Sequence, residues 1–205
     1  MSFPELELIY FAAPGRARPI RLVLEIGKIP FKDTRVTKEE FGALLQAGEL
    51  PLQTVPILKV DGKFASSQSG AIIRFVAALA GLQLTGATAV VRGEDIVATL
   101  EDILGLWVKY FSSSEEEKEK NGIDFVESGF PFYAKHIESI LGNRQHEGPF
   151  VNEKLSWVDI YMYCFAELGV DTAKAVNKES PLLKFPRFAA VVKAVSEIPE
   201  VAAHQ

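Results

Sequence analysis

Two pairs of residues in the first third of the chain have the types and spacing to hold a peptide. Val55-Pro56 begins a run with strand character, and Gln68-Ser69 opens a helical run twelve residues later. Proline cannot donate to a sheet ladder, so a proline at the start of a strand needs a reason. A glutamine and a serine at a helix start offer a hydroxyl and backbone N–H groups that suit a carboxylate. The two pairs together predict a site that holds a peptide-like ligand by its backbone and its acidic end.

The segments that would position these pairs alternate between strand and helix patterns. Strands are expected at 5–10, 31–36 and 56–60, and helices at 16–27, 38–47 and 68–80. Asp61-Gly62 is a two-residue hairpin signal, which predicts a fourth strand directly after it. The order β-α-β-α-β-β-α indicates a small α/β domain over residues 1–81.

The rest of the chain has the pattern of a helical bundle. Residues 82–88 are expected to be a linker, and residues 89–205 an all-α domain. Long helices are predicted over 89–111 and 114–141, a third from Ser156, and a last one over 186–197. Ser156 and Asp159 have the spacing of a capping box, in which the carboxylate reaches back to the N–H of the capping residue.

Composition excludes several classes of protein. The 205 residues carry a net charge of −5, which argues against nucleic acid as the main partner. No apolar run reaches the length of a membrane span, and the first residues lack the pattern of a secretory signal. Cys164 is the single cysteine, which fits a reducing, cytoplasmic location, and the three histidines lack metal-ligand spacing, so no metal is expected.

The order and spacing of several short motifs are shared with one family. The matching pieces are Ile9-Tyr10-Phe11, Gly15-Arg16-Ala17, Thr54-Val55-Pro56-Ile57-Leu58, Gln68-Ser69-Gly70-Ala71 and Ser156-Trp157-Val158-Asp159. In this respect the chain resembles the cytosolic glutathione S-transferases, most closely the sigma class. The resemblance covers almost the whole chain and implies a thioredoxin-like N-terminal domain, an all-α C-terminal helical bundle and a homodimer.

The resemblance implies that Tyr10 and Arg16 are catalytic. A free thiol with a pKa of about 8.5 is only a few per cent ionised at neutral pH, and its thiolate is the nucleophile. A phenolic O–H aimed at the sulfur stabilises the thiolate by roughly 1.5–3 kcal/mol, and a nearby cation such as Arg16 favours ionisation further. Without the resemblance, the pattern around Tyr10 is equally compatible with a core tyrosine. The two other arginines of this segment, Arg18 and Arg21, are expected to make surface or interdomain pairs.

The remaining glutathione contacts are also implied by the resemblance. A cis Pro56 would let Val55 present its backbone to the cysteinyl part, and Gln68 and Ser69 would bind the γ-glutamyl carboxylate. Asp102 would reach the ligand's ammonium from the partner subunit. Phe41 and Thr54 occupy positions near the glycine end where the family more often has tryptophan and a longer polar side chain. Three alternatives stay open there: Lys38 replaces the contact, Gln53 replaces it, or the contact is weak.

A pocket for a small hydrophobic electrophile is implied by register with the family. Its lining would be Phe11, Leu104, Val108, Tyr161, Cys164 and Phe165. Most of these residues could instead be ordinary core residues of packed helices. The leading interpretation is a detoxifying glutathione transferase with glutathione as co-substrate. Two alternatives stay open, a glutathione-dependent isomerase such as prostaglandin D synthase and a non-enzymatic, crystallin-like or ligand-binding relative.

Overall fold

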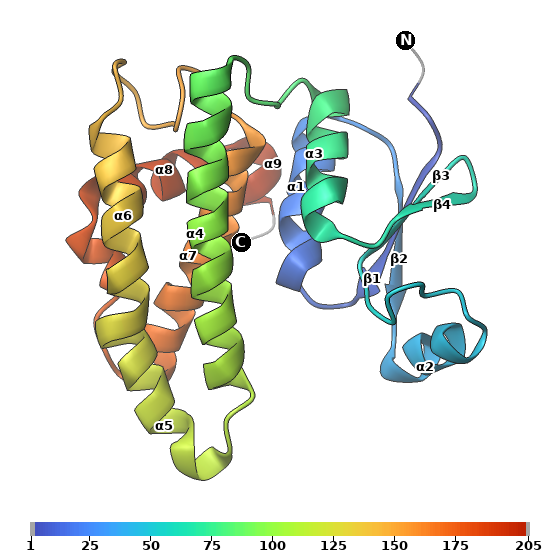
Figure 1. The fold of residues 1–205 in the computed structure, drawn as a ribbon, viewed down its shortest axis with the longest axis horizontal. Coiled ribbons are helices and arrows are strands. Elements are labelled where there is room, and N and C mark those ends of the chain that lie inside the picture. Colours follow the sequence, from blue (N-terminus) through green and yellow to red (C-terminus); the bar gives the residue numbers. More distant parts are fainter. Residues whose placement is uncertain (1–2, 204–205) are drawn as a thin grey trace. The chain divides into compact units, whose positions relative to one another are not determined.

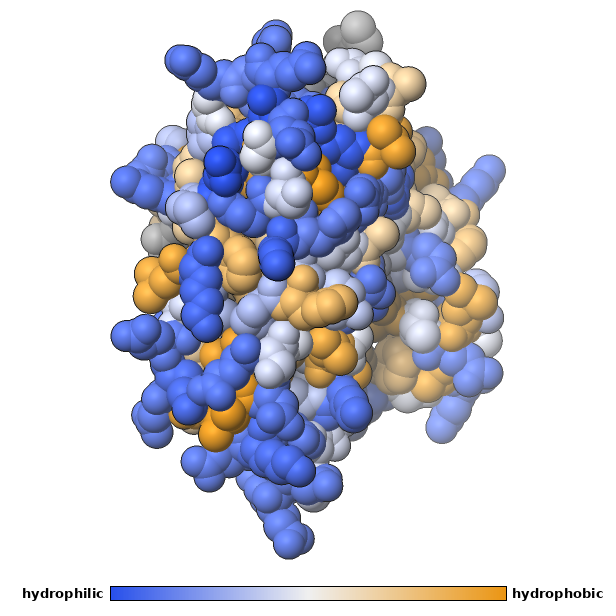
Figure 2. Space-filling model, turned by 60° about the vertical axis from the view of Figure 1, so that its left-hand side comes forward, coloured by the Kyte–Doolittle hydropathy of each residue, from blue (hydrophilic) through white to orange (hydrophobic). Residues whose placement is uncertain are grey.

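The computed structural model describes residues 3–203, and the chain separates into two units, one up to Gln83 and one from Leu84 (Figure 1). The α/β and all-α character predicted for the two halves is confirmed. Across residues 3–203, no helix has both the length and the apolar character needed to span a membrane. Figure 2 shows a face on which hydrophilic residues predominate and hydrophobic ones form small groups.

Unit 1 is built around a four-stranded mixed sheet with the strand order β2-β1-β3-β4. Strand β1 runs parallel to β2 and antiparallel to β3, which is in turn antiparallel to β4. The predicted order of elements is confirmed, and the bounds are β1 (Leu6–Phe11), the 3-10 turn η1 (Gly15–Ala17), α1 (Arg18–Ile26), β2 (Lys32–Val36), α2 (Lys38–Gln46), β3 (Ile57–Val60), β4 (Lys63–Ser66) and α3 (Ser69–Ala80).

Both faces of this sheet are covered. Side chains alternate along a strand, so Leu6 and Leu8 of β1 point to one face and Ile9 points to the other. Ile9 packs in a core cluster to which α2 adds Phe41 and its neighbours. Figure 1 shows α1 and α3 side by side on the other side of the sheet, which explains why Leu6 and Leu8 are also buried. Because both faces are occupied, functional groups can be presented from the loops at the strand ends.

The predicted hairpin between β3 and β4 is present. Asp61 and Gly62 have φ angles of 50° and 74°, the left-handed values that a tight two-residue hairpin turn requires. Helix α2 begins at a capping box in which the Thr37 hydroxyl accepts from the Glu40 N–H and the Glu40 carboxylate accepts from the Thr37 N–H.

Unit 2 is helical throughout its regular structure. Its bounds are α4 (Ala87–Phe111), α5 (Glu115–Asp124), α6 (Phe130–Gly142), α7 (Trp157–Ala175), α8 (Pro186–Ser196) and α9 (Pro199–Ala202), with a 3-10 turn η3 (Pro181–Lys184). Every residue of α7 from Trp157 to Ala166 is buried, so this helix forms the centre of the bundle. Helix α4 begins two residues before the predicted start, and α9 is too short to show a helical pattern in the sequence.

One predicted helix differs from the structure. The expected continuous helix over 114–141 is interrupted by a π-helical turn, η2 (Phe125–Gly129), that separates α5 from α6. The Phe130 N–H bonds to the Phe125 carbonyl, one residue further back than in an α-helix. Pro131 follows directly, and its ring would clash with the carbonyl four residues earlier in a regular helix. The wider turn lets the helix continue past this proline.

The start of α7 is held by the buried carboxylate of Asp159. Its oxygens accept from the Val151 N–H at 2.7 Å, the Ser156 N–H at 2.8 Å and the Ser156 hydroxyl at 2.7 Å. The predicted contact from Asp159 back to the Ser156 backbone is thus confirmed. Burial raises the pKa of Asp159, while the three donors act in the opposite direction.

Candidate functional site

The strand register of unit 1 gathers the predicted residues at one edge of the sheet. Ile9 of β1 pairs with Ile57 of β3, and continuing this antiparallel register sets Pro56 beside Tyr10 and Val55 beside Phe11. The Val55-Pro56 peptide bond is cis, as predicted. Because β4 runs in the same direction as β1, its end and the following α3 start reach this edge too. Tyr10, the catalytic candidate, and the Val55-Pro56 pair, the candidate for binding the ligand backbone, therefore lie at neighbouring strand ends.

The Tyr10 hydroxyl is held by the turn that follows β1. The Arg16 backbone N–H donates to it at 3.2 Å, so the oxygen already has a donor and its own proton remains to donate elsewhere. Gly15 makes this approach possible, since a Cβ at that position would lie 2.5 Å from the hydroxyl, and its φ is +41°. Sequence reasoning missed this role of Gly15, and only its place in a Pro14-Gly15 break hinted at a special backbone.

Arg21 corrects a prediction. It was expected to make a surface or interdomain pair, but it is 8% exposed and bonds to Asp33 at 3.0 Å within unit 1. The same guanidinium donates to the carbonyls of Phe11 and Ala13, and its carbon lies 5.9 Å from the Tyr10 ring centre. Arg21 therefore fixes the chain segment that leaves β1. The signal available in the sequence was its position on the apolar stripe of α1.

The start of α3 has the features of an anion site. Gln68 is its N-cap, with an extended backbone and no side-chain capping bond, and Ser69 is its first residue. The Gln68 N–H donates to the Ser66 hydroxyl at 3.2 Å, which orients the entry to the helix. Ser69 is 8% exposed, whereas Gln68 is exposed. The first N–H groups of a helix lack partners within it, and its dipole favours negative charge there.

The residues predicted near the glycine end lie around α2. Phe41 and Phe11 are in ring contact, with centroids 5.3 Å apart, and both pack against the Ile9 cluster. Thr54 is exposed in the loop before β3. A cleft in the same region is lined by Leu45, Gln46, Gly48, Leu50, Pro51 and Gln53. Phe41 thus supplies an apolar surface, and Gln53 borders a cleft beside it.

The candidates in unit 2 divide into buried and exposed sets. Leu104, Tyr161, Cys164 and Phe165 are buried in the bundle, and Val108 is 49% exposed. Tyr161 stacks on Phe165 at 4.3 Å and donates its hydroxyl proton to Glu101. Asp102 is exposed on α4, on the same helical face as Val91 and Ala98.

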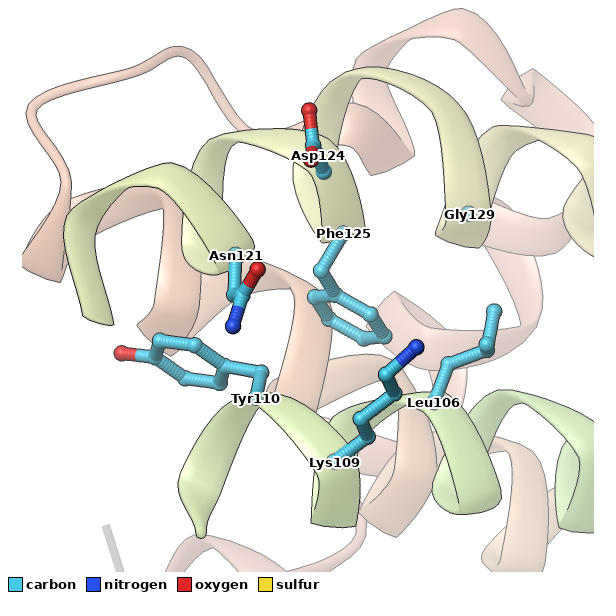
Figure 3. A pocket seen from close by; sticks show the side chains of 7 residues that line it. All are labelled: Leu106, Lys109, Tyr110, Asn121, Asp124, Phe125 and Gly129. Atoms are coloured by element: carbon cyan, nitrogen blue, oxygen red, sulfur yellow. The ribbon is translucent and has the colours of Figure 1, made fainter. Parts of the chain in front are cut away.

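A separate hollow of about 150 Å³ lies between α4 and the α5–η2 segment. Figure 3 shows Leu106 and Lys109 of α4 facing Phe125, with Asn121 beside Tyr110 and Asp124 directed away from them. Lys109, Asn121 and the other lining residues were not predicted as site residues. The π-helical turn therefore borders a small hollow that is distinct from the edge carrying Tyr10.

Comparison with known proteins gives consistent matches over the chain. Residues 101–205 match the model of the "Glutathione S-transferase, C-terminal domain" family. A Drosophila melanogaster protein named glutathione S-transferase S1 is 31% identical over 96% of this chain and 76% of its own. A glutathione S-transferase from Anopheles gambiae is 29% identical over 98% and 95%. The structure of prostaglandin synthase D of Nilaparvata lugens superposes with a TM-score of 0.81 at 28% identity, over 98% and 96%.

Proposed function

Because this chain belongs to the glutathione S-transferase family, we propose that it joins the thiolate of glutathione to small hydrophobic electrophiles at the Tyr10 edge of unit 1. It is a transferase with glutathione as co-substrate. The reaction forms a carbon–sulfur bond as the thiolate displaces a leaving group or adds to the electrophile. Its role would be detoxification in the cytoplasm.

The hydrogen bond from the Arg16 N–H to the Tyr10 hydroxyl is the observation that carries this proposal. A phenol that already accepts from a backbone donor directs its own proton to a further acceptor, and a thiolate sulfur is the acceptor that the reaction supplies. One charge-assisted bond of this kind stabilises the ionised thiol by about 1.5–3 kcal/mol. The half-buried Arg16 side chain would add positive charge near the sulfur.

The other parts of glutathione would bind to residues along the edge of the sheet that carries Tyr10. Val55, which precedes Pro56, would pair through its backbone with the cysteinyl part. Gln68 and Ser69 would bind the γ-glutamyl carboxylate at the start of α3. Phe41 would support the glycine end by apolar contact while Lys38 or Gln53 holds its carboxylate. Calorimetric titration with glutathione would measure the strength and stoichiometry of this site.

Tyr10→Phe tests the function directly. The variant keeps the ring and removes one charge-assisted hydrogen bond, so we expect kcat/KM for glutathione with chlorodinitrobenzene to fall roughly ten- to a hundredfold. The pKa of bound glutathione, followed by thiolate absorbance, should rise in parallel. Tyr133→Phe, which alters a half-buried tyrosine of α6 in unit 2, is the matched control and should leave both quantities unchanged. Equal activity of the two variants would remove Tyr10 from this role.

A homodimer would complete the site. Asp102 lies exposed on α4, where a carboxylate could reach the ammonium of glutathione bound to the partner subunit. Among the residues predicted to line the electrophile pocket, Val108 of unit 2 is exposed enough to contact a ligand, whereas Leu104, Tyr161, Cys164 and Phe165 are buried in the bundle. Asp102→Asn should raise the KM for glutathione more than it lowers kcat if the carboxylate binds the ammonium.

Isomerisation is a second candidate, favoured by the similarity to prostaglandin synthase D of Nilaparvata lugens over nearly the whole chain. A stabilised thiolate can attack one oxygen of an endoperoxide, which forms a sulfur–oxygen bond, breaks the oxygen–oxygen bond and leaves the second oxygen as an alkoxide that takes a proton. Removal of the proton from the carbon that bears the sulfur-bound oxygen then forms a carbonyl and releases the thiolate. Product analysis after incubation with prostaglandin endoperoxide separates the two activities. Formation of a glutathione adduct supports transfer, and formation of a prostaglandin with unchanged glutathione supports isomerisation.

A further inference from the structure

The hollow between α4 and the α5–η2 segment is not used by the proposed reaction. All of its lining residues belong to the unit that begins at Leu84, whereas Tyr10, Val55 and Ser69 belong to unit 1. Its volume is about 150 Å³, and an apolar cavity of about this size can bind benzene. The π-helical turn η2 forms part of its border, and such turns often occur at functional sites. The hollow is therefore large enough for a ligand with a single ring.

The inner lining of this hollow is apolar. It is made by Leu106 and Tyr110 of α4 and by Phe125 of η2. The Tyr110 and Phe125 rings are nearly parallel, at 9°, with centroids 6.4 Å apart. Phe125 is 4% exposed and meets Phe130 edge-on at 6.1 Å, so packing in the core fixes its ring. Flat, apolar surfaces of this kind favour an aromatic ligand over a polar one.

The two walls of the hollow are joined by hydrogen bonds at one end. The Asn121 amide of α5 donates to the Ser113 hydroxyl at 2.7 Å, and this hydroxyl donates to the Lys109 carbonyl of α4 at 2.9 Å. On the other side, a Cβ at Gly129 of η2 would lie 3.0 Å from Leu106 Cδ1, so the glycine allows Leu106 to pack closely there. The hollow is therefore bounded by contacts that the fold itself supplies.

Lys109 brings a positive charge to the rim of the hollow. Its side chain is exposed, and within residues 3–203 its ammonium forms neither a hydrogen bond nor an ion pair. Figure 3 shows this side chain facing Phe125, on the same side as Leu106. A cation beside apolar side chains complements a ligand that has an apolar body and an anionic group.

The nearby carboxylates leave this charge uncompensated. Asp124 is the one acidic lining residue, and it is exposed and directed away from the others (Figure 3). Glu127 of η2 is paired with Lys178 at 2.6 Å. The Lys118 ammonium lies 5.3 Å from the centre of the Tyr110 ring and adds positive charge near the same wall. The charges around the hollow therefore favour an anionic ligand over a cationic one.

We propose that this hollow binds a small aromatic monocarboxylate. The ring would lie against Leu106, Tyr110 and Phe125, and the carboxylate would pair with the Lys109 ammonium at the rim. The volume limits the ligand to about one ring, and the single cation among the lining residues suits a single negative charge. The site lies within unit 2 and does not depend on the proposed transferase reaction.

Saturation-transfer NMR titrations at constant ionic strength test the proposal, with benzoate, benzyl alcohol and acetate as probes. Benzoate should bind about three- to tenfold more tightly than benzyl alcohol, which lacks the charge, and acetate, which lacks the ring, should not bind. Lys109→Gln should abolish the preference for benzoate and leave the affinity for benzyl alcohol unchanged. Lys135→Gln, an exposed cation of α6 outside the hollow, is the matched control and should keep the preference.

Leu106→Trp tests the place of the ring. The larger side chain should fill the hollow and abolish binding of benzoate and benzyl alcohol, whereas Leu183→Trp, at a position that is 73% exposed, should bind both as the parent does. Thermal melting shows whether Leu106→Trp is folded, and the exposed Lys109→Gln variant decides the question if it is not. The proposal is overturned if benzoate does not bind, if benzyl alcohol binds equally well, if Lys109→Gln keeps the preference, or if folded Leu106→Trp still binds benzoate.

Discussion

At the scale of single residues, the position of the Tyr10 hydroxyl depends on the absence of a side chain at position 15. Gly15 has no side chain, and a Cβ there would lie 2.5 Å from the hydroxyl oxygen. Its φ of +41° also places it in a region that other residues adopt only with strain. The Tyr10 side chain can therefore reach the Arg16 N–H only because position 15 is glycine.

Gly15→Ala tests whether the position of the Tyr10 hydroxyl matters for turnover, because the variant keeps the phenol and changes only where it lies. The added methyl group must displace the Tyr10 hydroxyl, so we expect kcat/KM to fall about tenfold or more and stability to fall by about 1–3 kcal/mol. The matched variant Gly42→Ala adds a methyl group in α2 where no atom lies within 4 Å, and it should be neutral or stabilising by about 0.5–1 kcal/mol. Turnover and thermal melting measure both effects. Unchanged turnover in Gly15→Ala would contradict the role assigned to Gly15.

The candidate site was predictable from sequence only where a residue's type carries its chemistry. Val55-Pro56 and Gln68-Ser69 could be named because a proline before a strand and a hydroxyl at a helix start each have few uses. Tyr10 could be named only through the resemblance to the family, since a tyrosine at a strand end could equally be a core residue. Arg21 could not be placed, since the burial of this α1 side chain depends on its contact with Asp33 of β2.

At the scale of elements, α7 depends on one carboxylate at its first turn. Asp159 accepts two backbone N–H groups and one hydroxyl, and it lies in the interior. Its bond to the Val151 N–H ties the loop before α7 to the helix itself. The start of the central helix and the end of the preceding connection are thus fixed by the same side chain.

Asp159→Ala should be strongly destabilising. It leaves the Val151 and Ser156 N–H groups buried without acceptors, so we expect a loss of about 2–4 kcal/mol in the free energy of unfolding. Asp171→Ala removes an exposed carboxylate from the same helix and should cost less than about 1 kcal/mol, as is usual for its surface pair with Lys174. Urea denaturation of both variants measures the difference, and similar midpoints would refute the assignment.

Most elements were predictable because their patterns are local. The alternation along β1, the Asp61-Gly62 turn and the box at Ser156 each depend on residues a few positions apart. The π-helical turn at Phe125–Gly129 was not predicted, because the apolar spacing on either side of Pro131 is compatible with an unbroken helix. The sequence pattern shows that a helix passes this proline but not how its hydrogen bonds rearrange.

At the scale of the whole molecule, α4 carries an exposed face that a second subunit could cover. Val90 and Val91 are exposed hydrophobic residues near its start, and Ala98 and Asp102 continue along the helix. In unit 1, Phe64 of β4 and Phe75 of α3 are also exposed. Within unit 2, the neighbouring exposed side chains of Val90 and Val91 suit a protein–protein interface better than contact with water.

Val91→Asp should disrupt the proposed homodimer. Val91 is 65% exposed, so a carboxylate there is harmless in a monomer but costly in an apolar interface. Sedimentation velocity at micromolar concentration should show a shift from dimer to monomer. Leu183→Asp changes a residue of η3 that is 73% exposed and serves as the control, which should remain dimeric. A parent protein that sediments as a monomer would remove the dimer and the trans role of Asp102 together.

The bond from the Arg16 N–H to Tyr10 has a consequence for how the enzyme could change by mutation. Every amino acid except proline supplies a backbone N–H, so nearly all single substitutions at position 16 keep the hydroxyl aligned while changing the charge beside it. Any substitution of Gly15 adds atoms where the hydroxyl lies. Two adjacent positions thus differ sharply in tolerance: substitutions at position 16 can change the reactivity of the thiol in small steps, whereas every substitution at position 15 lowers activity and stability together.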